Sequence, residues 1–270
     1  MPLAVCATPI GNLEDVTLRV LRELSEADVV LCEDTRRSRA LLSRHGISAR
    51  LLSYHEHNEA KRTAELMPRL VGGERMALVS DAGLPGISDP GNRLVAAAIE
   101  AGVPVTVLPG ASAIETALVA SGFAFERYQF LGYLPRGSRA LASLWEEVAS
   151  WPHAVVAFES PQRLPVTLDS LAEALPDREI AVCRELSKAF EEIERGLPVD
   201  VLERYRSPPK GEITLVLAPS ATDRSSASGT EEAVAAVAEL VAAGVTRRDA
   251  VALVSRLTSI SRSRLYRRSL

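Results

Sequence analysis

The chain contains little cysteine and has no long hydrophobic run. Its three cysteines, Cys6, Cys32 and Cys183, are widely spaced and odd in number, which argues against a disulfide framework and against a cysteine-based metal site. No apolar run approaches the roughly 20 residues that cross a bilayer, and the N-terminus shows no secretion signal. These absences predict a cytoplasmic protein without membrane contact.

The chain also lacks a strong net charge. Its 31 basic and 35 acidic residues give a formal charge of −4, which argues against nucleic-acid binding over the whole surface. The charge is uneven, however, because residues 244–270 contain seven arginines and a single acid, Asp249. This basic C-terminal stretch is suited to contacts with phosphate groups.

Hydrophobic residues make up 47% of the 270-residue chain, which allows a substantial core in two domains. In the first half, short apolar runs alternate with helix-like segments. This alternation predicts parallel strands joined by right-handed crossovers, and hence an α/β domain over residues 1–120. The strand candidates in this half are residues 3–7, 29–32, 76–79 and 103–108.

Three helices of the first half have recognisable starts or stops. Asp15 is expected to cap a helix that places Val16, Val20, Leu21 and Leu24 on one face. Asn58 is expected to cap a second helix up to residue 71, with Pro68 in its last turn and glycines as its stop. Residues 92–101 form the third candidate, closed by a glycine.

The second half has fewer helices between its last strand candidates, which predicts a mixed or antiparallel sheet in a second α/β domain over residues 121–218. Residues 219–230 are small and polar and are expected to form a linker. Residues 231–270 are predicted to form short helices with a tight turn at Gly244 and a helix cap at Thr246. This pattern resembles a helix-turn-helix unit. The strand candidates of the second domain are residues 128–133, 154–158, 180–185, 190–196 and 212–218.

Four loops follow strand-like runs, where open α/β sheets bind their ligands. The longest is SDAGLPGISDPG (80–91), whose glycines and prolines exclude a regular strand or a long helix. Gly83 and Gly86 beside Asp81 suit a ligand with a hydroxyl pair or an ammonium group. Alternatively, the loop is a structural turn in which Asp81 and Asp89 act as local caps.

The other three loops are TPIGN (8–12), LPGASA (108–113) and ESPQR (159–163). The single glycine in residues 8–12 excludes a P-loop and the Gly-x-Gly-x-x-Gly turn of a dinucleotide site. Residues 108–113 precede a helix whose unpaired amides could hold an anionic or adenine-like group, or could merely cap the helix.

Three charged clusters are further candidates. Residues 33–36 are either part of a site or a solvated helix start, since acids are favourable at that end of a helix. His55 and His57 are too sparse for a metal site and are expected at an active-site edge in contact with substrate. Residues 184–188, followed by Glu191 and Glu192, contain either a general base or a set of salt bridges.

These motifs, in this order and spacing, resemble those of the tetrapyrrole methylase superfamily, and among its members those that methylate ribosomal RNA. The resemblance covers nearly the whole chain except residues 219–230. It rests on the following motifs: ATPIGNLEDVTLRVL (7–21), CEDTR (32–36), YHEHNE (54–59), VSDAGLPGISDPG (79–91), LPGASA (108–113), FLGYLPR (130–136), FESPQR (158–163), CRELSKAFEEIERG (183–196), KGEITLV (210–216) and SRSRLY (261–266).

The resemblance implies a homodimer that binds S-adenosylmethionine in a cleft between two α/β domains. It also implies methyl transfer to the ribose 2′-hydroxyl of a cytidine in the decoding region of 16S ribosomal RNA, within the 30S ribosomal subunit. A methylase of a small tetrapyrrole and a non-catalytic ribosome-assembly factor are the alternatives. The basic C-terminal stretch argues against the first, and the four ligand-type loops argue against the second.

The resemblance also assigns roles to single residues. The cofactor would be held by Pro9, Gly11, Asp81, Ala82, Gly83, Pro85, Ser88, Pro109, Gly110, Ser112 and Ala113. Independently of the resemblance, we expect the substrate to be contacted by Arg36, His55, His57, Arg163, Arg262 and Arg264. Glu185, Lys188 and Glu191 are the catalytic candidates, because a ribose hydroxyl needs a proton acceptor nearby.

The chain departs from the family pattern at three positions. Leu84 stands where the family usually has threonine, Gly86 where it has a larger aliphatic residue, and Ala111 where it has proline. The first change removes a hydroxyl, so we expect the loop to bind its ligand through backbone groups and Asp81.

Overall fold

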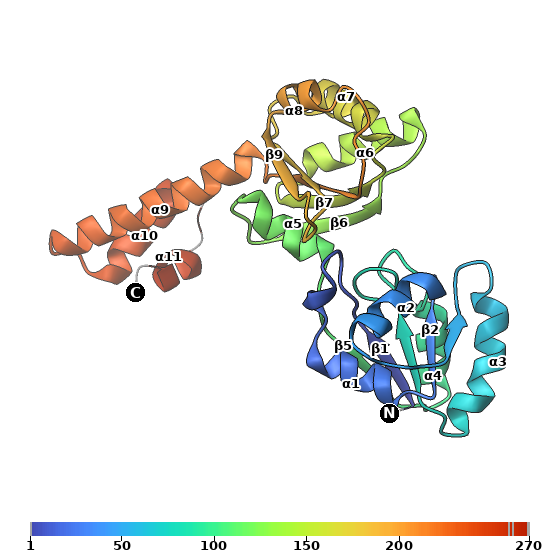
Figure 1. The fold of residues 1–270 in the computed structure, drawn as a ribbon. Helices are drawn as coiled ribbons and strands as arrows, with labels where there is room; N and C mark the ends of the chain where they lie inside the picture. The colour runs from blue at the N-terminus through green and yellow to red at the C-terminus, as the bar shows by residue number, and fades with distance from the viewer. Residues whose placement is uncertain (1, 259, 261, 269–270) are drawn as a thin grey trace.

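The computed structural model describes residues 2–258, 260 and 262–268, and the side chains in these ranges except 221–231, 263–264 and 268. Two α/β domains follow one another, each with a five-stranded sheet, and three helices project away from the second domain (Figure 1). The predicted pair of α/β domains is therefore confirmed. None of the helices among the described residues has the length and apolar character needed to cross a membrane.

The first sheet has the strand order β3-β2-β4-β1-β5, and all its neighbours are parallel, as the alternating pattern predicts. Its strands are β1 (Leu3–Cys6), β2 (Val29–Cys32), β3 (Leu51–Ser53), β4 (Met76–Val79) and β5 (Val105–Leu108). Its helices are η1 (Leu13–Asp15), α1 (Leu18–Glu26), α2 (Thr35–Arg44), α3 (Glu59–Val71) and α4 (Asn92–Glu100).

Helices cover both faces of this sheet, so its strands are apolar on both sides. Leu66 of α3 and Leu94 of α4 pack on one face. Val20 and Leu24 of α1, with Leu42 of α2, pack on the other face. All strands of a parallel sheet point the same way, and the loops that follow β1, β2 and β4 therefore meet at one edge.

The helix starts were predicted with mixed success. Asp15 does not cap α1: it ends η1, and Thr17 caps α1 by accepting a hydrogen bond from the Val20 amide. The reason is that Val16 is extended, so the helix can begin only after it. Asn58 does precede α3, which continues through Pro68 to its stop at Gly72.

The second sheet has the order β6-β7-β10-β8-β9. Only β6 and β7 pair in parallel, so the sheet is mixed, as predicted. Its strands are β6 (Tyr128–Tyr133), β7 (Ala154–Glu159), β8 (Ile180–Arg184), β9 (Glu192–Gly196) and β10 (Ile213–Leu217). Its helices are α5 (Ala113–Ser121), α6 (Ser138–Ser150), α7 (Leu164–Ala174) and α8 (Pro198–Arg204).

Helix α5 lies almost entirely before the predicted boundary at residue 120 but packs on the second sheet. Its residues Ile114 and Leu118 share a core with Val156 and Val216. Ile10, from the loop after β1, belongs to the same core. The two domains are therefore joined by apolar packing as well as by the chain.

The C-terminal unit consists of α9 (Ala221–Ala242), α10 (Arg247–Leu257) and α11 (Arg262–Arg268), which share a small core of their own. Thr246 caps α10 as predicted, by accepting a hydrogen bond from the Asp249 amide. The predicted linker at 219–230 was wrong for most of its length, because α9 begins at Ala221. This stretch contains no proline after residue 219, so nothing in it prevents the apolar helix that follows from extending backwards.

Candidate active site

A cavity of about 490 Å³ lies where the loops of the first sheet face the second domain. This volume is within the range of small-molecule sites in proteins, roughly 300–1,000 Å³. The first domain lines it with Ile10, Glu33 and much of the loop 80–91. The second domain lines it with Tyr133, Phe158 and Glu212, among others. The cavity is thus an interdomain cleft, as expected.

Two of the predicted ligand loops are hydrogen-bonded to each other across the end of the first sheet. The Thr8 amide donates to the Gly83 carbonyl (2.8 Å), and the Gly83 amide donates to the Thr8 carbonyl (3.1 Å). The Thr8 hydroxyl donates to the Ser80 carbonyl at 3.1 Å. Gly83 has a φ of +79°, a conformation that favours glycine. These bonds fix the backbone of the loop 80–91 at the cleft.

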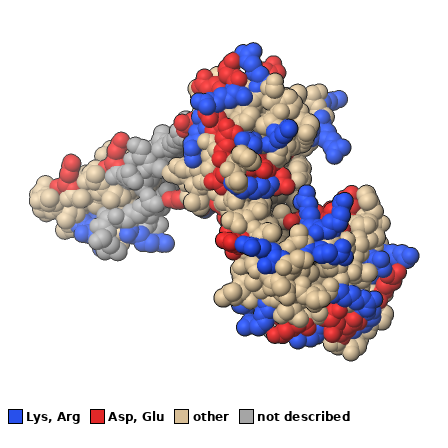
Figure 2. Space-filling view, in the orientation of Figure 1, with Lys and Arg blue, Asp and Glu red and all other residues tan. Residues whose placement is uncertain are grey.

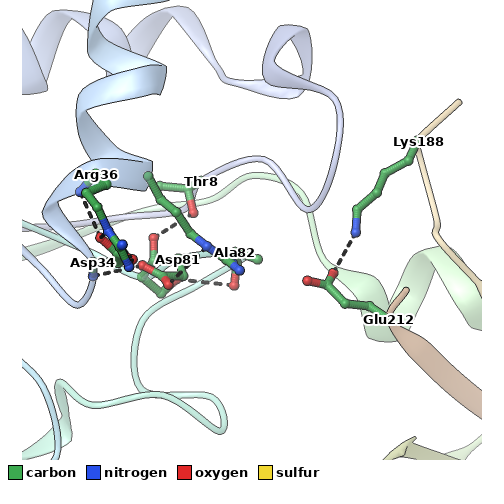
Figure 3. A network of polar contacts seen from close by, with 9 residues as sticks. Thr8, Asp34, Arg36, Asp81, Ala82, Lys188 and Glu212 are labelled. Carbon is green, nitrogen blue, oxygen red and sulfur yellow. Dashed lines mark hydrogen bonds and ion pairs between the residues drawn. The ribbon is translucent and has the colours of Figure 1, made fainter. Parts of the chain in front are cut away.

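Asp81 is held by the neighbouring loop after β2. One of its carboxylate oxygens accepts the Asp34 amide at 3.0 Å, and the other lies 3.6 Å from Arg37 Nε. Asp34 itself caps α2 and pairs with Arg36, whose guanidinium lowers the pKa of Asp34 to about 2. Figure 3 shows this cluster on one side of the cleft and Lys188 with Glu212 on the other.

Three carboxylates line the first-domain side of the cavity: Glu33, Asp81 and Asp89. Burial raises the pKa of Asp89 to about 7, and the nearby charges of Glu33 and Asp81 add to this effect. The pKa of Glu33 is also raised, by burial and by Asp81. A site with this concentration of negative charge favours a cationic ligand.

The wall from the second domain is aromatic. Tyr133, at the end of β6, packs on Phe158 with 5.5 Å between ring centroids, and the ring centroid of Phe130 lies 5.0 Å from that of Phe158. Tyr133 remains 66% exposed, so its ring presents a free surface at the cleft. Such a surface can stack on a planar ligand.

The loop between β8 and β9 has an unusual backbone. Glu185 and Ser187 have φ values of +53° and +62°, which non-glycine residues rarely adopt. Lys188 Nζ bonds to the carboxylates of Glu185 (2.7 Å) and Glu212 (3.0 Å), and the hydrogen bond from Lys188 lowers the pKa of Glu185. Glu191 accepts the Ser187 amide at 2.6 Å.

None of the three described side chains Glu185, Lys188 and Glu191 is among the residues that line the cavity. Their contacts show that they shape the loop, and their catalytic role stays a prediction. The loop also touches the first domain, because a Cβ added at Gly11 would lie 2.5 Å from Lys188 Cγ and 2.7 Å from the Leu186 carbonyl.

The predicted cofactor residues fall into two groups. The cavity is lined by Asp81, Ala82, Gly83, Ser88, Ser112 and Ala113. The remaining five are absent from its lining: Pro9, Gly11, Pro85, Pro109 and Gly110. Two of these five act through packing, since a Cβ at Gly110 would lie 2.9 Å from the Ala7 Cβ and Gly11 abuts the loop 185–191.

The predicted substrate residues are not gathered in one place. Arg36 is exposed beside the cleft, where Figure 2 shows Lys and Arg side chains at the edge of the first domain that faces the second. Arg163 instead turns inward, to Glu159 and the Leu134 carbonyl. Arg262, the first residue of α11, lines a depression between α10 and α11, and the Arg264 side chain lies outside the described residues.

The two histidines lie after β3. His55 bonds to Asn58 through Nε2, and its buried Nδ1 has no partner, whereas His57 is exposed beside Glu56. Within the described part of the chain, no group of three or more His, Cys, Asp or Glu residues could hold a metal ion. The cysteines are free and buried.

Sequence reasoning missed several cavity residues. Tyr133 and Glu212 lie in the motifs FLGYLPR (130–136) and KGEITLV (210–216) but were given no role, and Asp89 was considered only as a local cap. Asp89 does not cap a helix, since Gly91 occupies the N-cap position of α4. A signal was present: a second acid in a ligand-type loop, eight residues after Asp81.

Two α/β domains with a ligand-sized cleft between them define the class of the protein. The chain matches the family model for Tetrapyrrole (Corrin/Porphyrin) Methylases over residues 2–201, and it belongs to this family of methyltransferases. The similarity to solved structures agrees: uroporphyrin-III-C-methyltransferase from Thermus thermophilus has a TM-score of 0.56 at 22% identity, over 80% of this chain and 93% of that one. Diphthine synthase has a TM-score of 0.59 at 14% identity, over 80% and 89%.

Relatives within the family are more specific. A protein of Mesorhizobium japonicum named "Ribosomal RNA small subunit methyltransferase I" is 40% identical over 99% of this chain and 91% of its own length. Proteins of the same name from Halalkalibacterium halodurans and Thermotoga maritima are 45% and 44% identical, each over 80% of this chain and over 75% and 97% of their own lengths. The resemblance inferred from the motifs is confirmed.

Proposed function

We propose that this protein transfers a methyl group from S-adenosylmethionine to the ribose 2′-hydroxyl of a cytidine in 16S ribosomal RNA. The observation that carries the proposal is the 40% identity, over 99% of this chain, to a relative named as a small-subunit ribosomal RNA methyltransferase. We further propose that it acts in the cytoplasm as a homodimer, as the resemblance implies.

The residues of the cleft fit this cofactor. S-adenosylmethionine carries a sulfonium and an ammonium group, and the carboxylates of Glu33 and Asp81 match these positive charges. The first amides of α5, at Ser112 and Ala113, are suited to its carboxylate. Ile10 and Ile114 line the cavity with apolar surface suited to an adenine ring.

The departures from the family pattern are compatible with binding. Leu84 lines the cavity and also packs against the core of the first domain, so it replaces a hydroxyl with apolar contact. Gly86 has a φ of +85°, and its carbonyl accepts a hydrogen bond from Asn92 Nδ2 at 2.9 Å. The loop therefore keeps a fixed backbone without the threonine.

When bound, S-adenosylmethionine supplies an electrophilic methyl group. The protein residues then have two tasks, which are to position the reactants and to accept a proton. Holding two reactants in the right geometry can lower the activation barrier by about 7–11 kcal/mol. The bridge between Thr8 and Gly83 and the contact of Gly11 with the loop 185–191 supply rigid walls for this purpose.

The C-terminal unit offers a surface for the RNA. A depression between α10 and α11 is lined by three arginines and a tyrosine (Arg248, Arg262, Arg267 and Tyr266), together with one acid, Asp249, and the apolar Val251 and Ala252. Arginine is suited to phosphate oxygens, and tyrosine to an unpaired base. An acidic cleft does not attract RNA, so the affinity for the substrate is expected to depend on surfaces such as this one.

Purified protein with labelled S-adenosylmethionine and 30S subunits that lack the modification tests the proposal. Label in the ribose of a 16S cytidine is the expected result, and normal cofactor binding without any label in the RNA contradicts it. Deleting residues 231–270 should weaken binding to the subunit and leave the cofactor dissociation constant unchanged. Equal transfer by the full-length and shortened proteins would assign RNA recognition to the α/β domains.

A further inference from the structure

The cleft contains one carboxylate with no assigned task. Asp89 lies near the end of the loop 80–91 and lines the cavity together with Glu33 and Asp81. Within the part of the chain that the structure describes, Asp81 is paired with Arg37, but no ion pair joins Asp89 to an arginine or lysine. Among the described residues, no basic side chain therefore balances its negative charge.

The backbone fixes the position of Asp89. Ser88, directly before it, has a φ of +62°, and Gly91, two residues later, has a φ of +144°. A Cβ at Gly91 would lie 3.0 Å from Leu78 Cδ2 of β4, so the end of the loop is pressed against the sheet. Asp89 is thus held at a defined place in the cleft.

The surroundings of Asp89 come from both domains. Glu33 follows β2, Asp81 follows β4, and Tyr133, at the end of β6 in the second domain, lines the same cavity. The Ser80 hydroxyl stabilises the charged form, but burial and the two acids outweigh it, so the pKa of Asp89 is raised to about 7. A proton acceptor works best when its pKa lies near the working pH.

The other carboxylates around the cleft are less suited to this task. The side chain of Glu159 is fully buried and bonded to Arg163 and Thr167. Glu185 and Glu212 share Lys188. Asp81 already accepts the Asp34 amide.

Glu33 is the remaining alternative. Of the four acids that raise the pKa of the Tyr133 hydroxyl, Asp89 has the largest effect and Glu33 the smallest. Glu33 also lies near Glu56 and His55 of the first domain. Asp89 therefore combines an open acceptor with a position between the two walls of the cleft.

We propose that Asp89 accepts the proton of the attacking ribose hydroxyl, an inference that rests on the proposed function. The hydroxyl oxygen forms a bond to the methyl carbon while the carbon–sulfur bond breaks and its electron pair stays on sulfur. The proton passes to a carboxylate oxygen of Asp89 and leaves to water after the product dissociates. A neutral thioether and a methylated ribose result, so charge and atoms balance.

The test compares Asp89→Asn, which keeps the shape of the side chain, with Glu100→Gln on the exposed face of α4 as a matched control. Single-turnover transfer to 30S subunits is measured between pH 5.5 and 9 at saturating S-adenosylmethionine. We expect Asp89→Asn to lower the rate by about 10²–10⁴-fold. Its cofactor dissociation constant, measured by calorimetry, should stay within about threefold of wild type, and Glu100→Gln should behave as wild type.

Two further readouts do not depend on the absolute rate. The wild-type rate should rise with pH and level off above about 7, and the rate of the variant should not show this rise. Carbon-13 NMR of the carboxyl groups should show one aspartate signal that titrates near 7 and is missing from Asp89→Asn. Asp89→Glu should recover part of the rate.

Several outcomes would overturn the proposal. An unchanged transfer rate in Asp89→Asn excludes the proposal. The proposal is also excluded if the Asp89 carboxyl titrates near 4 and the rate of Asp89→Asn has the same pH profile as that of wild type. Cofactor binding that is tenfold weaker at an unchanged maximal rate would make Asp89 a cofactor ligand instead. Wild-type protein that binds S-adenosylmethionine but methylates no RNA is a distinct result, which refutes the proposed function itself.

Discussion

Each α/β domain places a carboxylate where a buried strand reaches the cleft, yet the two carboxylates differ in their surroundings. Asp81 follows β4 of the first domain and Glu159 ends β7 of the second, and both line the cavity. The Asp81 side chain is 22% exposed and accepts a single amide, with Arg37 at 3.6 Å. The Glu159 side chain is 0% exposed and is bonded to Ser160, Arg163 and Thr167.

This difference separates the tasks of the domains. A carboxylate with free acceptor positions can bind a ligand, whereas one whose oxygens are all bonded can only hold its own surroundings in place. Arg163 also donates to the Leu134 carbonyl, which directly follows Tyr133. The acid of the second domain therefore positions the aromatic wall, and Asp81 of the first domain keeps acceptor positions open toward the cavity.

The largest effect is expected for Glu159→Ala. Removing this carboxylate leaves the largely buried Arg163 unpaired and should lower the free energy of unfolding by about 3–5 kcal/mol. Denaturant unfolding measures the loss. The control is Glu173→Ala, at an exposed position of helix α7, which follows Arg163. This variant should change the free energy of unfolding by less than about 0.5 kcal/mol. Similar losses in both variants would remove the contrast between the domains.

Asp81→Ala should act on binding more than on stability. Losing a hydrogen bond to a charged ligand costs about 1.5–3 kcal/mol, so the affinity for S-adenosylmethionine should fall roughly 10–100-fold. Because Asp81 is partly exposed, we expect the free energy of unfolding to change by about 1 kcal/mol or less. Calorimetry and denaturant unfolding on the same preparation separate the two effects. Unchanged affinity would place the cofactor elsewhere.

The contact between the domains provides a third test. A methyl group at Gly11 would lie 2.5 Å from Lys188 Cγ, so Gly11→Ala should destabilise the protein by about 1–3 kcal/mol. Gly137→Ala is a suitable control, since its added Cβ meets nothing within 4 Å. Urea unfolding compares the two. If both variants are equally stable, the loops after β1 and β8 do not constrain each other.

The sequence predicted the elements better than their contacts. Strands β2 and β4 were located to the residue, because each is a four-residue apolar run between polar segments. Strand β3 was missed: with three half-buried residues it is too short to show a pattern. The N-terminal half of α9 was also missed, because small polar residues are typical of linkers but do not prevent a helix.

The site was predictable only in outline. The glycines and prolines of the loop 80–91 indicated a ligand loop, and the cavity lies there. Whether an acid is free or bonded depends on residues distant in the chain, as with Arg163 at the Leu134 carbonyl, and a single sequence carries no signal for it. The pairing of Thr8 with Gly83 across the sheet is hidden for the same reason.

The smallest effect concerns the acids of the first domain. The pKa of Asp89 is raised from 3.8 to about 7 in the folded protein, so folding favours its protonated form. Wild-type stability is therefore lost progressively as the pH rises from about 4 to about 7, and Asp89→Asn escapes this loss. Because Asp89 is only partly buried, solvent screening reduces the gain of the variant at pH 8 to the order of 1 kcal/mol. Urea unfolding at pH 5 and pH 8 should show the variant gaining on wild type at the higher pH, and an equal difference at both would mean that folding does not raise the pKa of Asp89.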